Sequence, residues 1–106
     1  MVALVLAAGA GNDITLNNAN DFSGAVSITS GRNVTLVDVN AISLGASTVS
    51  GTLAVTASGN ISETGALTVT GGSSTFTIDT ALNADVLLGS QANHFGNQSV
   101  TINTIN

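Results

Sequence analysis

The chain has 106 residues and a formal net charge of −5, with no cysteine, no proline and a single basic residue, Arg32. Without cysteine there can be no disulfide bridge, thiolate nucleophile or zinc–thiolate site. One arginine cannot neutralise a phosphate backbone, so we expect no nucleic-acid partner. Charged residues make up 7% of the chain and mean hydropathy is +0.47. This composition argues against disorder, and we expect a packed protein that is not an enzyme and has no cofactor and no metal site.

The first ten residues, 1–10, contain an apolar run similar to the hydrophobic region of a signal peptide. No positive charge precedes this run, so we interpret it as a strand of a preceding repeat. Any export signal is then expected to lie outside this chain. No stretch approaches the roughly 20 apolar residues of a transmembrane helix, and we expect no membrane span.

Beyond residue 10, short segments alternate apolar and polar residues, and many of the apolar residues are β-branched. This period of two predicts strands with one buried face. The separators are rich in Asn, Gly and Ser, which favour turns, and no segment has the spacing of an amphipathic helix. The expected strands are 14–16, 26–28, 34–36, 42–44, 53–55, 67–69, 76–78, 86–88 and 100–102.

The expected strands recur every 8 to 14 residues, which fits a β-sandwich or a β-solenoid. The scarcity of aromatic residues favours the solenoid, and so does an internal similarity in which 13–28 returns as 85–102. Shorter similarity, as between 14–16 and 34–36, indicates about 20 residues per coil. We therefore predict an all-β fold, a parallel β-helix of about five coils with essentially no helix. Residues 1–106 would form one segment of a longer repeat array.

In such a solenoid the apolar residues stack inside, and Asn side chains can form ladders at the turns. Phe22 and Phe95 occupy equivalent positions in the internal similarity, so we expect both to fill corners of the core. The predicted core consists of Ile14, Leu16, Phe22, Val26, Ile28, Val34, Leu36, Ile42, Leu44, Leu53, Val55, Leu67, Val69, Phe76, Ile78, Val86, Leu88, Phe95, Val100 and Ile102.

Four stretches carry a family resemblance: GNDITLNNANDFSGAVSI (11–28), NVTL (33–36), LGASTVSG (44–51) and GALTVTG (65–71). They resemble the degenerate repeats of filamentous-haemagglutinin-like adhesins and related large exported bacterial surface proteins. The resemblance implies a right-handed parallel β-helix, export across the outer membrane and a role as an adhesin shaft at the cell surface. It carries over no catalytic or ligand residues. No segment resembles the secretion domain of such proteins, so we expect a fragment of a longer molecule.

Few side chains are candidates for chemistry. Paired carboxylates can support glycoside hydrolysis, and Asp13, Asp21, Asp79 and Asp85 all lie near expected turns. A sugar site would also need basic or aromatic residues, which this chain lacks, so we interpret these aspartates as turn residues that bond their own backbone. His94 is the only imidazole and aligns with Asp21 in the internal similarity, which indicates an exposed turn rather than a metal ligand.

Residues 9–13 partly resemble a calcium-binding nonapeptide, but no consecutive copy follows to complete a site. Glycosylation sequons occur at Asn33, Asn60 and Asn97, about as many as chance would give in a chain so rich in Asn, Ser and Thr. Arg32 is interpreted as a solvated cation at a turn.

These observations predict a structural role. We expect a stiff, protease-resistant shaft at the bacterial cell surface, whose open strand edges associate end to end with further copies and can form fibres. The alternative is a binding module for a host-surface glycan or protein, or for ice, on a flat solenoid face. The T-x-T segments 68–70 and 75–77 favour such a face, although other coils replace Thr with Ser, Ala or Asp.

Overall fold

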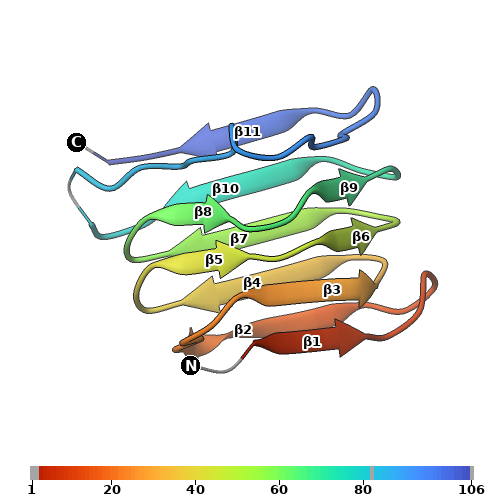
Figure 1. Cartoon of the computed structure of the whole chain (residues 1–106), viewed down its shortest axis with the longest axis horizontal. Coiled ribbons are helices and arrows are strands. Elements are labelled where there is room, and N and C mark those ends of the chain that lie inside the picture. Colours follow the sequence, from red (N-terminus) through yellow and green to blue (C-terminus); the bar gives the residue numbers. More distant parts are fainter. Residues whose placement is uncertain (1–2, 82, 106) are drawn as a thin grey trace.

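The computed structural model describes residues 3–81 and 83–105, and all regular elements in this part of the chain are strands (Figure 1). The chain winds through stacked coils from one end of the molecule to the other, and the extents are 35 × 30 × 24 Å. Among the described residues there is no helix that could cross a membrane. The strands are β1 (Leu4–Ala7), β2 (Ile14–Asn20), β3 (Val26–Ser30), β4 (Val34–Asp38), β5 (Ile42–Leu44), β6 (Ser47–Val49), β7 (Leu53–Ala57), β8 (Ile61–Glu63), β9 (Leu67–Val69), β10 (Ser74–Ile78) and β11 (Val100–Asn103).

Three parallel sheets run along the stack and form its walls. The five-stranded wall has the order β11-β10-β7-β4-β2, the four-stranded wall the order β1-β3-β5-β8, and β6 pairs with β9 in a two-stranded wall. Each coil crosses from one wall to another through a short turn, so neighbours within a sheet come from successive coils (Figure 1). The predicted all-β solenoid of parallel strands is confirmed.

The register of the five-stranded wall gives the length of each coil. Ile14, Val34, Leu53, Ser74 and Val100 are successive Cα partners, so the coils contain 20, 19, 21 and 26 residues. The structure therefore has about four turns rather than the five that were predicted. The difference arises in the last coil, which is longer and joins the two smaller walls only through single bridges.

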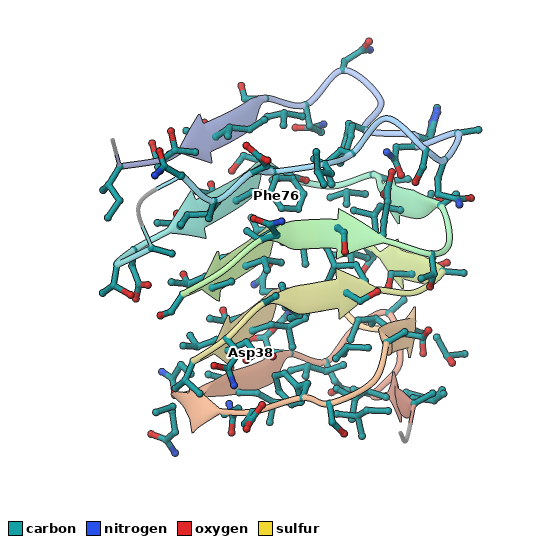
Figure 2. All side chains as sticks on the ribbon, turned by 60° about the vertical axis from the view of Figure 1, so that its left-hand side comes forward. Asp38 and Phe76 are labelled. Carbon is teal, nitrogen blue, oxygen red and sulfur yellow. The ribbon has the colours of Figure 1, made fainter. Side chains whose placement is uncertain are left out.

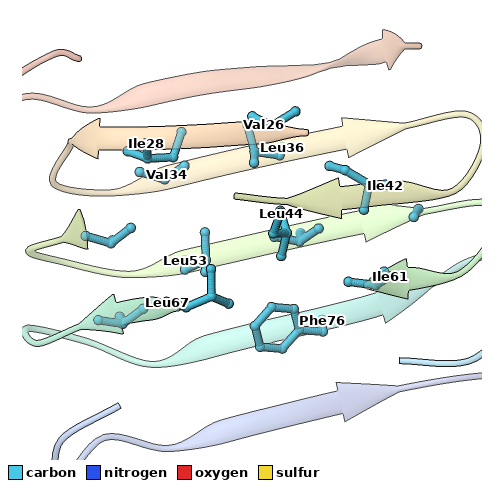
Figure 3. Packing of buried hydrophobic residues seen from close by; sticks show 14 of the residues in the cluster. Val26, Ile28, Val34, Leu36, Ile42, Leu44, Leu53, Ile61, Leu67 and Phe76 are labelled. Carbon is cyan, nitrogen blue, oxygen red and sulfur yellow. The ribbon is translucent and has the colours of Figure 1, made fainter. Parts of the chain in front are cut away.

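Alternate residues of each strand point inward and stack on those of the next coil (Figure 3). Most of the predicted core is buried, and Val49, Ala57 and Ile61 join it. The predicted residues that are buried are Ile14, Val26, Ile28, Val34, Leu36, Ile42, Leu44, Leu53, Val55, Leu67, Val69, Phe76 and Ile78. Those that are partly buried against this cluster are Leu16, Phe22, Val86, Leu88 and Phe95.

Placing Val100 and Ile102 in the core was wrong, because these side chains are 41% and 52% exposed. Their Cα partners, Ser74 and Phe76, are buried, so β11 continues the inward-facing columns of the wall. Strand β11 is the last strand of the five-stranded wall, and no described strand pairs with its other edge. An inward-facing residue in a terminal layer is covered on one side only.

The internal similarity between 13–28 and 85–102 is not a structural repeat. Ile14 begins a strand of the five-stranded wall, whereas Val86 bridges to Ile61 on the four-stranded wall. The expected equivalence of Phe22 and Phe95 also fails. Phe95 packs edge-on against Phe76, with ring centroids 6.4 Å apart, while Phe22 lies in the turn between β2 and β3.

Candidate functional surfaces

The ionisable side chains that the sequence singled out do not converge on one site. Asp13 and Asp85 precede strands on different walls, and Asp21 and Asp79 accept hydrogen bonds from Asn40 Nδ2 (3.0 Å) and Ser58 Oγ (2.8 Å). The bonds therefore run between coils rather than to the aspartates' own backbone. No three His, Asp or Glu side chains gather into a possible metal group in the described part of the chain.

Asp13 and Arg32 form an exposed ion pair, with 2.8 Å between Oδ1 and Nε. The hydrogen bond from Arg32, together with one from the backbone N–H of Asn33, lowers the pKa of the Asp13 carboxyl below its ordinary value. Arg32 is thus not a free turn cation but ties one coil to the next. Asp13 is the acidic residue of the calcium-like segment 9–13, and this pairing engages it structurally.

Asn and Asp side chains at the turns hold the backbone of the adjacent coil. Asn33 Oδ1 accepts hydrogen bonds from the N–H and hydroxyl of Thr52, at 3.0 and 3.1 Å. Asn60 Oδ1 accepts the N–H of Asp85 at 2.8 Å. In these contacts single side chains bridge to backbone, rather than the ladders of like amides that the sequence suggested. Sequon residues Asn33 and Asn60 therefore contribute to coil stacking.

Two buried carboxylates went unnoticed in the sequence, because each occupies an inward position of an alternating strand. Asp38 is 1% exposed, and its two oxygens accept the N–H groups of Phe22 (3.1 Å) and Asn40 (2.8 Å), which closes one corner of the coil (Figure 2). Glu63 is 7% exposed; its Oε1 accepts a bond from Asn93 Nδ2 at 2.9 Å, while Oε2 has no partner among the described residues.

A polar side chain also replaces ladder bonds where the wall bends between β5 and β6. The buried Ser47 hydroxyl accepts the N–H of Ile28 at 3.1 Å and donates to the carbonyl of Gly45 at 2.9 Å. One coil later Asn93 does the same work, since its Oδ1 accepts the N–H of Leu67 and its Nδ2 donates to the carbonyl of Leu88, both at 2.9 Å. His94 follows directly and is exposed, in a bridge with Thr68 rather than in a ligand cluster.

A shallow groove of about 280 Å³ lies on the outer face of the four-stranded wall. The turn 22–25 forms one side, and Ser43, Ser62 and Thr64 line the floor. The lining carries hydroxyl groups but no charged side chain, and Phe22 is its one aromatic residue.

The outer face of the five-stranded wall carries aligned threonines from different coils. One column consists of Thr15, Thr35, Ala54, Thr75 and Thr101, which are successive Cα partners. A second column consists of Val37, Thr56, Thr77 and Asn103. We call these nine residues the threonine array. Thr68 lies elsewhere, on the two-stranded wall beside Thr48, so the segments 68–70 and 75–77 do not form one row.

The sequence model of a family described as repeats of unknown function (DUF5649) matches residues 3–29 and 31–102 of the chain. The two matched segments cover nearly all of the described coils. No curated protein and no solved structure matched the chain.

Proposed function

The chain belongs to the DUF5649 family of repeats of unknown function, and from this premise we propose that it serves as a stiff shaft segment that associates end to end. The observation that carries the proposal is the direction of its contacts. Backbone ladders, core columns and turn brackets all join one coil to the next. Such an interior resists bending and can be lengthened by adding coils without altering those already present.

The terminal layers are the natural places for association. Strand β11 has a described partner, β10, on one side only, and strands β1 and β2 likewise pair only with β3 and β4. Unpaired parallel edges are templates for another strand, and here they accompany exposed inward-facing Val100 and Ile102. Additional coils, whether from the same polypeptide or from a second copy, would satisfy both the edge and the apolar side chains.

The register specifies how two copies would join. Placing β11 of one copy against β2 of the next sets Val100 opposite Ile14 and Ile102 opposite Leu16. This arrangement extends the column of partners that runs from Ile14 to Val100 within one chain. The same stacking brings 86–88 of the first copy beneath β1 of the second, so both walls continue across the join.

The test measures molar mass by size-exclusion chromatography with light scattering, over a range of concentrations. Mass should rise with concentration, and Val100→Lys should suppress the rise by placing a charge in the join. Val39→Lys is the matched control, because Val39 is also 41% exposed but lies in a turn at the side of the stack. A monomer at high concentration, or equal suppression by both variants, would overturn end-to-end association.

The same proposal places the shaft in an exported bacterial surface adhesin, where the parent molecule would contact a host glycan or protein. Support comes from the haemagglutinin-like stretches in the sequence and from a fold suited to a long spacer. Antibodies raised against the chain should label intact cells of the producing bacterium. Labelling that requires lysis of the cells would contradict a surface location.

A further inference from the structure

The threonine array is a two-dimensional grid, and its regularity comes from the backbone. From β4 through β7 and β10 to β11 the strand register runs without a shift. Neighbouring strands lie about 4.8 Å apart, and residues i and i+2 of one parallel strand about 6.6 Å apart. Six of the nine grid positions carry threonine, which presents a hydroxyl and a methyl group together.

The array has no charged side chain, although the chain carries a net charge of −5. The Asp13–Arg32 pair lies just before the first strands of the wall, and Asp79 lies just after β10. Charged groups hold tightly oriented water of their own, whereas hydroxyl groups beside methyl groups can hydrogen-bond water in a lattice that the surface spacing sets.

A second copy of the chain is a poor occupant of this face. Five strands about 4.8 Å apart and about 17 Å long offer roughly 400 Å², about half of the roughly 800 Å² per partner in a standard protein interface. A polysaccharide is also disfavoured, because sugar rings stack on exposed aromatic side chains. The wall's aromatic residue, Phe76, is buried on the opposite face of the sheet.

We propose that the threonine array binds an ordered water lattice, that is, the surface of ice. The two spacings of the grid are close to the oxygen repeats on a prism face of hexagonal ice. The threonine hydroxyls hydrogen-bond to lattice water, and the methyl groups occupy the depressions between lattice positions. Because a crystal presents the same repeat over its whole surface, each further coil of this wall adds contacts of the same kind.

The test is partition of the fluorescently labelled chain between a slowly growing ice hemisphere and the surrounding liquid. The wild-type chain should be enriched in the ice. Thr56→Lys, which puts a charge in the middle of the array, should abolish the enrichment. Thr48→Lys is the matched control, because it makes the same substitution at an exposed threonine of the two-stranded wall and should leave the enrichment intact.

A gain-of-function variant removes the dependence on loss of binding. Ala54→Thr completes the column Thr15–Thr35–Thr75–Thr101 and should increase the fraction of protein that enters the ice. Circular dichroism and melting temperature establish that each variant is folded. If Thr56→Lys does not fold, the response to Ala54→Thr decides.

Three results would overturn the proposal. The first is exclusion of the wild-type chain from ice, as for a protein without ice affinity. The second is equal loss of enrichment in Thr48→Lys and Thr56→Lys. The third is adsorption to microcrystalline cellulose or chitin that Thr56→Lys abolishes, without enrichment in ice, which would identify a polysaccharide surface instead.

Discussion

The carboxylate of Asp38 is buried where a coil turns from the five-stranded to the four-stranded wall (Figure 2). It satisfies two backbone N–H groups, one in its own turn and one from Phe22 in the preceding coil. A buried polar group is tolerated when its hydrogen bonds are made, and here the bonds also fix how two coils meet. Asp38 therefore acts as a corner clamp.

Removing this clamp should be costly. We expect Asp38→Ala to lower the free energy of unfolding by about 2 kcal/mol, because it leaves two N–H groups without an acceptor. Asp38→Asn should lose less, since its single amide oxygen can still accept one of the two bonds. Urea denaturation of the three proteins measures the difference. Equal losses in the two variants would show that the bonds to Phe22 and Asn40 are not what matters.

Glu63 is a buried carboxylate of the opposite kind, with one bonded oxygen and one unpartnered oxygen among the described residues. Its strand position pairs with Leu44, so a charge-bearing side chain continues an apolar column. We expect Glu63→Gln to stabilise the fold by about 1 kcal/mol, because a buried neutral amide loses less hydration than a carboxylate.

The control for Glu63→Gln is Asp85→Asn, which removes one negative charge at an exposed position. Both variants have the same net charge, so any general effect of charge on stability appears in both. Thermal denaturation compares them with the wild-type chain. A Glu63→Gln variant that melts below the wild-type chain would assign the carboxylate a stabilising role.

At the scale of elements, the stacking of coils depends on close approach between turns. A Cβ atom at Gly65 would collide with the backbone nitrogen of Ala46 in the preceding coil. Gly89, in contrast, has open space where its Cβ would lie. The two glycines thus separate the packing requirement of the turns from the general flexibility of the residue.

We expect Gly65→Ala to destabilise the fold by about 1–3 kcal/mol, the usual range for forcing extra volume into a packed site. Gly89→Ala should change stability by less than about 0.5 kcal/mol, as for surface substitutions that touch no special feature. Denaturant midpoints of the two variants provide the measurement. A large loss in Gly89→Ala would mean that the last coil is as tightly constrained as the central ones.

At the scale of the whole molecule, the stability of a solenoid is distributed along one axis. The central strands of the five-stranded wall have a neighbour on each side, whereas β11 pairs with β10 alone. We expect amide hydrogen exchange to be slowest in β7 (Leu53–Ala57) and much faster in β11 (Val100–Asn103). The measurement is native-state exchange followed by NMR, and uniform protection would indicate a single cooperative unit instead.

The sequence by itself determined the local rules of this protein. Alternation with a period of two predicted the strands and the inward position of residues such as Leu36 and Val55, because strand geometry sends successive side chains to opposite faces. Asn, Gly and Ser marked the turns, and a spacing of about 20 residues indicated stacked coils. These properties depend on neighbouring residues, so one sequence is sufficient to predict them.

Only the tertiary structure decided which coil and which wall each segment occupies. Coil lengths vary from 19 to 26 residues, so small differences in the turns accumulate and move 85–102 out of step with 13–28 despite their similarity. For the same reason the alignment of Thr15, Thr35, Thr75 and Thr101 was not visible in the sequence, whereas 68–70 and 75–77 suggested a row that does not exist. The surface of a solenoid is set by register between coils, and register depends on the whole path of the chain.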